Sequence, residues 1–329
     1  MKNSKCRHII VLLCAFFVTD SYAQESFLFK HSHYLFNPYL ANPAIAGSKD
    51  FNSISISLRQ YISAVEGSPK TQIISGHGRL RYPAKGYSYS FRNPGFTNIG
   101  VGGLLYNNSY GAFRRLGAQL TYAYHVPLNR EAYSHLSFGL SATGLYYSMN
   151  PNLFNVIGDP LLSNGTQGSF IPDANFGIYY YGIGHYAGLS VSNLFESGLS
   201  LGKDEYETID IHRRYFFIAG YQWLLFRNRS IMLEPSVMIQ TTEETVADFY
   251  KNIDINLKLY TQSIYFGTSL RVNQSMAFFT LYQFRNIFGG LSYEIPFSKA
   301  INITTGSAEI IVGMNFGKGR NIFGDSRYW

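Results

Sequence analysis

Apolar and polar residues alternate along most of this chain with the period of a β-strand. In segment 116–126, LGAQLTYAYHV, Leu120 belongs to an apolar row and Gln119 to a more polar one. Segment 251–260, KNIDINLKLY, repeats the pattern with Ile and Leu against Asn, Asp and Lys. Because successive side chains of a strand point to opposite faces, each segment predicts a strand with one apolar face.

Similar segments separated by turn residues recur along the chain, and counting them gives about 14 strands without an amphipathic helix of useful length. Many run to about 10 residues, the length with which a tilted strand crosses a bilayer, whereas strands of soluble proteins are usually about 5 to 6. Tyr and Phe gather near the strand ends, as aromatic girdles at two water interfaces require. The pattern therefore predicts an all-β fold, a transmembrane antiparallel β-barrel over residues 51–317, whose apolar rows face lipid.

Loop lengths predict the orientation of this barrel, because outer-membrane barrels have short periplasmic turns and longer outer loops. An even number of strands also places both termini in the periplasm. The alternation fails at 83–96, which is long, and at 273–275, which is short. The predicted periplasmic turns are 183–184, 227–229, 262–263 and 285–286, and the predicted outer loops are 148–172, 194–212, 241–250 and 296–305.

Residues 1–23 have the pattern of a secretory signal peptide. Basic residues precede the apolar run 9–18, and small residues at Ser21 and Ala23 predict cleavage after Ala23. The mature chain would then reside in the outer membrane, in contact with its lipid. Both cysteines of the sequence, Cys6 and Cys14, lie in the segment removed, so we expect neither a disulfide nor a catalytic thiolate.

Composition and motifs argue against several functional classes. The formal charge is +7, but Lys and Arg never cluster beyond pairs, so no nucleic-acid surface is expected. No nucleophile elbow or phosphate loop is present, and the acidic segment 203–212 lacks the spacing of a calcium loop. We therefore predict no enzyme, no cofactor and no metal. Glu234, Glu294 and Glu309 fall within strands, where they are expected to face the lumen or an interface and to pair with Arg or Lys.

Several segments together resemble one family, the PorP/SprF outer-membrane proteins of Bacteroidetes, which are associated with type IX secretion and gliding. The chain departs from the usual family pattern at Tyr61, at Tyr293-Glu294 and at Ala308-Glu309. The segments that carry the resemblance are NPAIAG (42–47), SLRQY (57–61), EGSPKTQ (66–72), TYAYHVPL (121–128), DPLL (159–162), PDANFGIYYYG (172–182), YAGLSVSNL (186–194), AGY (219–221), EPSVMI (234–239) and GSAEIIVGMNF (306–316).

The resemblance implies an accessory barrel without chemistry of its own. Members similar to PorP work with the periplasmic lipoprotein ring of the secretion machine and with a peptidoglycan-binding lipoprotein. Members similar to SprF are tied to the export or surface attachment of one large adhesin, recognised through its C-terminal domain. Both roles remain open at this point. The alternative is an outer-membrane transport pore for a small solute, since the sequence does not reveal whether the lumen is open.

Three segments are candidates for partner binding. The first joins the first two predicted strands and comprises Arg59, Gln60, Glu66, Gly67, Pro69, Lys70 and Thr71; its Gly-Ser-Pro could equally just close a hairpin. The second lies within 24–50, where Asn42 and Pro43 belong to one of two Asn-Pro steps; it could plug the barrel, dock a periplasmic partner or be a flexible lead-in. The third is the basic periplasmic tail 318–329, which could touch a partner or be disordered.

Overall fold

The structure is a computed structural model of the 329-residue chain. It describes residues 33–317 apart from several gaps, and the statements below apply to this part of the chain. The gaps within that range are 50, 64–66, 82–95, 130–133, 150–166, 197–198, 201–207, 210, 227–230, 244 and 298–303.

Seventeen strands and four short helices make up the described residues. The strands are β1 (Asn52–Ser63), β2 (Lys70–Arg81), β3 (Phe96–Tyr110), β4 (Phe113–Asn129), β5 (Ser134–Met149), β6 (Gln167–Gly182), β7 (His185–Ser192), β8 (Leu199–Ser200), β9 (Thr208–Ile209), β10 (Arg214–Tyr221), β11 (Trp223–Phe226), β12 (Ile231–Thr242), β13 (Ile253–Tyr260), β14 (Ile264–Arg271), β15 (Ser275–Phe284), β16 (Ile287–Pro296) and β17 (Thr304–Phe316). The helices are α2 (His33–Phe36), η1 (Pro38–Leu40), η2 (Pro43–Ile45) and η5 (Val246–Asn252), of which the last three are 3₁₀ helices.

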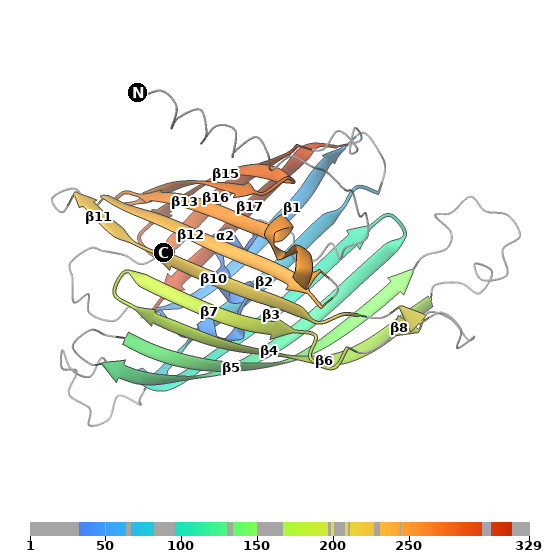
Figure 1. Ribbon diagram of the computed structural model, residues 1–329, viewed down its shortest axis with the longest axis horizontal. Helices are drawn as coiled ribbons and strands as arrows, with labels where there is room; N and C mark the ends of the chain where they lie inside the picture. The colour runs from blue at the N-terminus through green and yellow to red at the C-terminus, as the bar shows by residue number, and fades with distance from the viewer. Residues whose placement is uncertain are drawn as a thin grey trace, which may run out of the picture.

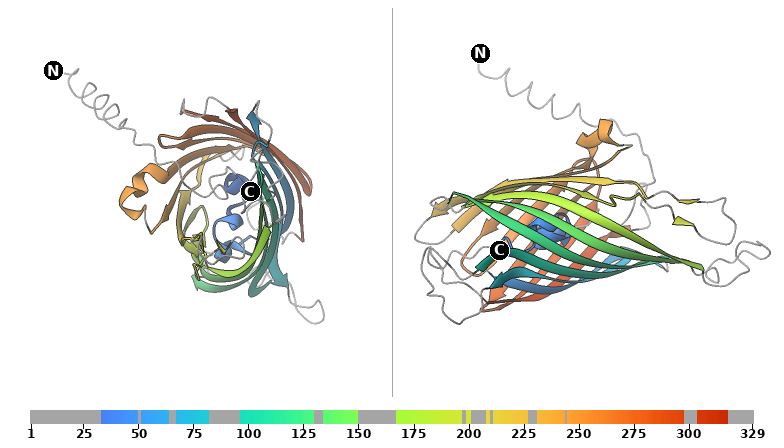
Figure 2. Two further views of the ribbon diagram at one scale, coloured as in Figure 1. Left: turned by 90° about the vertical axis from the view of Figure 1, so that its right-hand side faces the viewer. Right: turned by 90° about the horizontal axis from the view of Figure 1, so that it is seen from below.

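The strands close into one antiparallel barrel (Figures 1 and 2). Each strand pairs with its neighbour along the chain, and β1 pairs with β17 to complete the ring, while β8 and β9 form a separate two-stranded sheet. β10 and β11 both pair with β12 and are two parts of one strand interrupted at Gln222, so the 15-stranded sheet is a barrel of 14 strands. The predicted fold is confirmed.

Burial alternates along the strands as the sequence pattern predicts. In β4, Leu120 is 75% exposed on the outer face, whereas Gln119 and His125 are 8% and 0% exposed on the inner face. In β13, Ile255 and Leu257 face outwards, and Asp254, Asn256 and Lys258 are buried inside. The apolar rows therefore form the outside of the barrel, where lipid replaces a protein core, and the polar rows line its lumen.

The two ends of the barrel differ. Asn52, the first residue of β1, pairs with Phe316, the last residue of β17, so both lie at one end, which we call the base. The opposite end, where β1 finishes, is called the loop end. The turns 183–184 and 285–286 are tight and lie at the base, as the loop lengths predict.

One predicted loop is shorter than expected. Residues 148–172 were predicted as a loop, but β5 and β6 remain paired as far as Met149 and Gln167. The hairpin continues because Leu145 and Ile171 are buried against each other, and Tyr147 and other partly buried side chains pack against this pair. The strand pair therefore extends towards the loop end well beyond the predicted boundary.

Three of the helices lie inside the barrel and not on its surface. In the view along the barrel, α2, η1 and η2 appear in blue within the ring of strands (Figure 2). The fourth, η5, joins β12 to β13 at the loop end. None of the helices in the described residues is long and apolar enough to cross a membrane.

Candidate functional site in the barrel lumen

Residues 33–47 fill much of the lumen, and we call this segment the plug. Its two Asn-Pro steps each begin a short 3₁₀ helix, with Pro38 and Pro43 in the first turn, where a missing N–H costs nothing. The Asn42 side chain accepts a hydrogen bond from the Ala44 N–H at 2.9 Å and so caps the second helix. The two prolines thus favour a compact, bent segment and not an extended strand.

The plug forms the main apolar core of the molecule together with the lumen wall. Tyr39, Ala44 and Ala46 are fully buried, and Ile45 is almost so. Their apolar cluster also contains wall residues from both sides of the ring, including Ile73 in β2, Leu104 in β3, Phe216 in β10, Met238 in β12, Phe279 in β15 and Ile311 in β17. Since the cluster reaches across the barrel, the plug obstructs its cross-section.

Glycines in the wall make room for the plug backbone. A β-carbon at Gly139 in β5 would overlap Pro43 and the Ala44 backbone, and one at Gly100 in β3 would overlap the Ala46 carbonyl. Any other residue at these positions would force the plug or the wall to move. The wall is therefore shaped to receive the backbone of the plug at close range.

Wall side chains also bind the plug through its backbone carbonyls. Ser137 in β5 donates to the Ala44 carbonyl at 2.6 Å, and Ser190 in β7 donates to the Ala41 carbonyl at 2.6 Å. The Nε2 of His125 in β4 lies 2.9 Å from the Ala46 carbonyl and donates to it. Buried carbonyls without such partners would carry a desolvation cost, so these three donors stabilise the docked plug.

His125 is itself held in place by a chain of polar contacts. Its Nδ1 lies 2.9 Å from the Tyr181 hydroxyl, which contacts the Arg79 guanidinium in turn. With Nε2 donating to the plug, Nδ1 is the acceptor and Tyr181 the donor, which fixes a neutral imidazole tautomer. This arrangement orients the His125 ring towards the plug.

The other end of the plug, nearer the loop end, meets charged wall residues. The Tyr34 hydroxyl donates to Asp254 Oδ2 at 2.9 Å and lies 3.1 Å from Asn256 Oδ1, both in β13. His33 pairs with Glu309 in β17 and lies 3.2 Å from the Ser57 hydroxyl in β1. This end of the plug thus contacts wall strands from β13 to β17 and β1.

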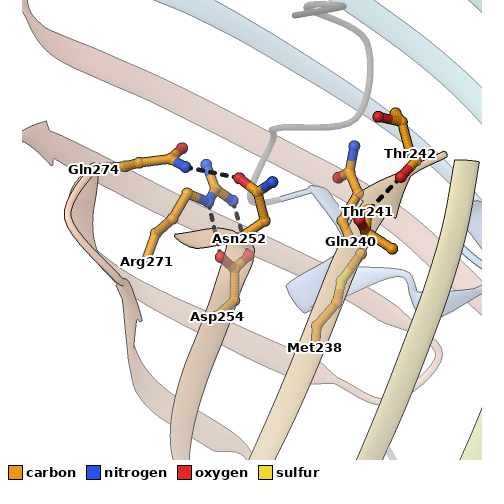
Figure 3. Close-up of a pocket in the computed structure, with 8 residues that line it drawn as sticks. All are labelled: Met238, Gln240, Thr241, Thr242, Asn252, Asp254, Arg271 and Gln274. Atoms are coloured by element: carbon orange, nitrogen blue, oxygen red, sulfur yellow. Dashed lines mark hydrogen bonds and ion pairs between the residues drawn. The ribbon is translucent and has the colours of Figure 1, made fainter. Parts of the chain in front are cut away.

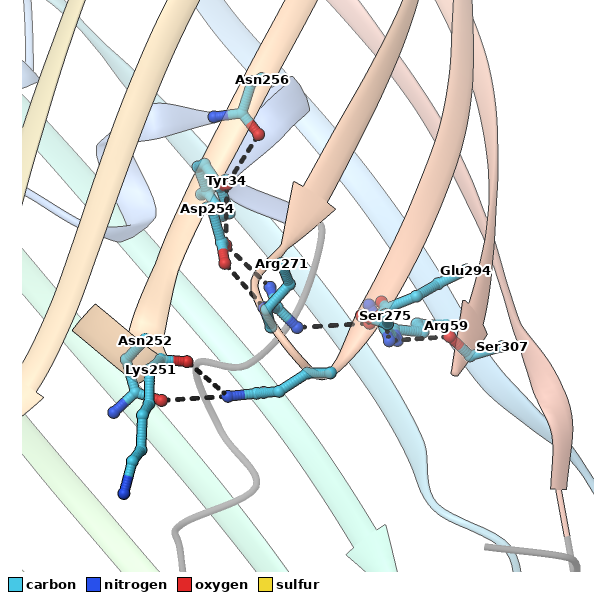
Figure 4. A network of polar contacts seen from close by, with 11 residues as sticks. Tyr34, Arg59, Lys251, Asn252, Asp254, Asn256, Arg271, Ser275, Glu294 and Ser307 are labelled. Carbon is cyan, nitrogen blue, oxygen red and sulfur yellow. Dashed lines mark hydrogen bonds and ion pairs between the residues drawn. The ribbon is translucent and has the colours of Figure 1, made fainter. Parts of the chain in front are cut away.

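A buried ion-pair network extends from the Tyr34 contact along the lumen wall (Figure 4). Arg271 binds both oxygens of Asp254 at 2.8 and 2.9 Å and lies 3.3 Å from Glu294. Arg59 donates to Glu294 at 2.7 Å and to the Ser307 hydroxyl at 2.7 Å. Each carboxylate therefore has cationic partners, which buried charges require.

Another buried carboxylate lies nearer the base. Glu234 in β12 is 3.4 Å from the Lys258 ammonium and accepts hydrogen bonds from Gln222, Tyr186 and Tyr260. The lumen-facing positions of these carboxylates and the pairing of Glu234 and Glu294 with Lys and Arg agree with the prediction from sequence. Glu309 pairs with His33 of the plug and lies directly opposite Arg59 in the register of β1 with β17.

A shallow polar pocket opens beside this network at the loop end (Figure 3). Its groups are mainly amides and hydroxyls, with the Asp254–Arg271 ion pair at its wall. Such groups can hydrogen-bond a peptide or another polar partner, and they do not include a nucleophile paired with a base. Among the described residues, no three metal-binding side chains converge. The lining residues are Met238, Gln240, Thr241, Thr242, Asn252, Asp254, Arg271 and Gln274.

The candidate partner-binding residues do not form one site. Arg59 and Thr71 are paired across β1 and β2 and are buried in the lumen. Gln60, Gly67 and Lys70 are exposed, and the positive φ of Gly67 (83°) accompanies a hydrogen bond from the Gly111 N–H to the Gly67 carbonyl at 2.9 Å. Asn42 and Pro43 belong to the plug, Pro69 lies in the turn before β2, and Glu66 lies outside the described residues.

Sequence reasoning missed the residues that hold the plug. The alternation places Ser137, Ser190 and His125 on the polar face of their strands but does not reveal what they bind. His33 and Tyr34 have no periodic signal because they precede the first strand. Only the two Asn-Pro steps indicated an unusual segment there.

The comparison with family models decides what this plugged barrel is. The model described as "Type IX secretion system membrane protein PorP/SprF" matches residues 23–314, which is most of the chain. The chain belongs to the PorP/SprF family. It is therefore a membrane component associated with type IX secretion, and the resemblance inferred from the sequence segments is confirmed. Among curated proteins, no sequence matches significantly.

Several solved structures that resemble this PorP/SprF member are distant in sequence. The toluene transporter TodX of Pseudomonas putida has a TM-score of 0.49 and 10% identity, covering 85% of this chain and 94% of TodX. The KdgM porin has a TM-score of 0.36 and 8% identity, covering 80% and 99% of the two chains. The translocator domain of the autotransporter NalP from Neisseria meningitidis has a TM-score of 0.36 and 9% identity, covering 82% and 90%. At these values the similarity carries no functional argument.

Proposed function

We propose that this PorP/SprF protein is a non-enzymatic accessory barrel of type IX secretion and gliding motility in the outer membrane, reached after signal peptide cleavage near Ala23. The observation that carries the proposal is the plug. A lumen filled by residues 33–47 and lined with matching glycines and hydroxyl donors is suited to a structural or docking role. A pore for a small solute would need an open path through the same space.

The arrangement of polar groups supports a role without catalysis. Ser75 and His77 share the inner face of β2, and a hydroxyl near an imidazole is an arrangement that a hydrolase could use. Ser75 instead hydrogen-bonds to the Ser55 hydroxyl at 3.0 Å and accepts from Asn37 of the plug at 2.8 Å. A serine held this way by structural partners is poorly placed to act as a nucleophile.

The two ends of the barrel suit two kinds of partner. Under the predicted orientation the base faces the periplasm, where the secretion lipoprotein ring and a peptidoglycan-binding lipoprotein would meet the tight turns and the tail 318–329. The loop end faces outwards, where its polar pocket supplies amide and hydroxyl groups for a secreted adhesin recognised through its C-terminal domain. The proposed function is docking of one of these partners.

Purification under gentle detergent conditions tests this proposal. We expect the tagged protein, recovered from outer membranes and analysed by mass spectrometry, to bring down the ring lipoproteins or a single giant adhesin. A variant with Gln240→Ala and Gln274→Ala in the pocket would separate the partners, because it should lose an outer partner and retain a periplasmic one.

A planar-bilayer recording on the same preparation provides the counter-test. A sealed accessory barrel should give no steady conductance. If the protein is recovered alone even after crosslinking and conducts ions, it is a self-sufficient pore, and the docking proposal is wrong.

A further inference from the structure

The helix η5 lies outside the ring of strands. It joins β12 to β13 at the loop end, and in the view along the barrel it projects sideways beyond the wall, in orange (Figure 2). In the perpendicular view it lies in front of the strands, at the end of β12 (Figure 1). The helix therefore stands beside the barrel and not over the opening of its lumen.

Both ends of η5 are fixed to the barrel. Before the helix, the Thr242 N–H at the end of β12 donates a hydrogen bond to the Thr245 hydroxyl at 3.0 Å. At its other end, the Gln274 side-chain amide donates to the Lys251 carbonyl at 3.2 Å and to Asn252 Oδ1 at 3.0 Å. These contacts hold η5 in one position relative to the wall strands.

Two neighbouring aromatic side chains of η5 are exposed. Phe249 is 47% exposed and Tyr250 is 40% exposed, and their ring centroids lie 6.3 Å apart in an edge-to-face arrangement. Within the described part of the chain, neither ring belongs to the apolar clusters of the barrel. Because apolar surface is unfavourable in water, such a pair indicates contact with an apolar partner.

The strand that follows η5 indicates which partner this is. The helix ends at Asn252, immediately before Ile253 begins β13, and the outer row of β13 with Ile255 and Leu257 faces lipid. The aromatic pair therefore lies at the end of a lipid-facing row, where acyl chains give way to headgroups. Aromatic side chains are enriched at this boundary of membrane proteins.

Lys251 adds a positive charge at the same place. Its ammonium lies 5.7 Å from the centre of the Tyr250 ring, and its side chain points away from the ion-pair network of the lumen (Figure 4). A lysine at this boundary can keep its methylene chain in the apolar layer while its ammonium reaches the lipid phosphates. Residues 249–251 thus combine two apolar rings with one cation, as a contact with anionic lipid requires.

We propose that η5 is an anchor at the membrane interface. Phe249 and Tyr250 insert between the acyl chains and the headgroups of the leaflet at the loop end, and Lys251 binds anionic headgroups. A protein partner that approaches the barrel opening would meet the polar pocket, whereas η5 points sideways into the space that lipid occupies. The anchor fixes the depth of the loop end in the membrane.

Spin labelling tests this proposal, because both cysteines of the sequence lie in the predicted signal peptide. The protein with Phe249→Cys is labelled with a nitroxide and reconstituted in phosphatidylcholine vesicles, with or without phosphatidylglycerol. Leu257→Cys in the outer row of β13 is the lipid reference, and Lys70→Cys, exposed at the loop end of β2, is the water reference. Collision of each label with oxygen, which concentrates in lipid, is compared with collision with a neutral, water-soluble nickel complex. Heat-modifiable electrophoretic mobility checks that each variant has folded.

We expect the ratio of oxygen to nickel collisions at Phe249→Cys to be severalfold above that at Lys70→Cys and below that at Leu257→Cys. A ratio equal to that at Lys70→Cys would place η5 in water, where it suits a protein partner, and would overturn the proposal. Rare collisions with both reagents would also overturn it, because the ring would then be packed against protein.

The role of Lys251 is tested in the same vesicles. Phosphatidylglycerol should raise the ratio at Phe249→Cys, and the additional substitution Lys251→Gln should abolish that increase. If the increase persists, Lys251 does not bind anionic headgroups and this part of the proposal is wrong. None of these outcomes depends on which protein is recovered with the barrel, so failure of the anchor is distinguishable from failure of the proposed docking function.

Discussion

The close fit between Gly139 and the plug makes this single residue a sensitive position. Gly139→Val would push side-chain atoms into Pro43 and Ala44, and overpacking of this kind costs about 1–3 kcal/mol. We expect the plug to undock in part of the molecules, giving higher ion conductance in planar bilayers than the unmodified protein. Gly103→Val is the matched control, because a β-carbon there meets no atom closer than 3.8 Å. Equal conductance of the two variants would contradict the assigned role of the plug.

The Arg59–Glu294 pair is the second residue-scale feature with a measurable effect. Arg59→Met leaves Glu294 with fewer cationic partners in the lumen, and breaking a buried ion pair typically costs about 3–5 kcal/mol. Arg271 also contacts Glu294, so we expect a loss at the lower end of that range. The free energy of unfolding in detergent measures it.

Arg213→Met provides the comparison for this measurement. Arg213 pairs with Glu196 and Glu243 at a partly exposed position, where solvent screens the charges, so its substitution is expected to destabilise the barrel much less than that of Arg59. If both substitutions lower the free energy of unfolding equally, the buried ion pairs do not stabilise the barrel more than an exposed pair does.

At the scale of the strands, the outer face can be mapped with charged substitutions. Arg in place of a lipid-facing residue costs about 2–4 kcal/mol at the bilayer midplane and about 0–1 kcal/mol near its surfaces. Leu120→Arg in the middle of β4 is therefore expected to reduce the fraction of folded barrel strongly. Phe170→Arg, in the extension of the β5–β6 hairpin towards the loop end, is expected to have little effect. Heat-modifiable mobility measures both, and a severe defect in Phe170→Arg would place that extension inside the bilayer.

The strands were predictable because lipid and lumen impose opposite requirements on alternate residues. Leu120 and Gln119 in β4 could be assigned to opposite faces from the sequence alone, and so could Ile255 and Asp254 in β13. The extent of the β5–β6 hairpin was not predictable, because apolar residues such as Phe170 and Ile171 occupy both faces of the strand there and packing of Leu145 against Ile171 decides.

The candidate site was harder to predict from the sequence because its contacts join residues that are far apart along the chain. The separation of 276 residues between His33 and Glu309 leaves no periodic trace, and neither does the fit of Ala44 against Gly139. The Asn-Pro steps signal a bent segment, but a bent segment inside the lumen and one outside it have the same sequence pattern.

At the scale of the whole molecule, the PorP/SprF barrel is a ring closed around its own N-terminal segment. The inner rows of the strands would suit a water-filled channel, yet they bind the plug and one another. Polar inner faces are therefore not sufficient evidence of a pore. What decides is whether another part of the chain binds the polar groups of the inner faces and fills the space between them.

The pairing of β1 with β17 has a consequence for the order of assembly. These strands are the first and last of the barrel, and the plug ends only a few residues before β1 begins. Threading the plug into an already closed ring would mean passing Tyr39 and its neighbours through a packed space, whereas laying it on the still open sheet of β3 to β7 disrupts nothing. We therefore expect β1 and β17 to pair last, after the plug has bound to the inner face of the open sheet and guided its closure.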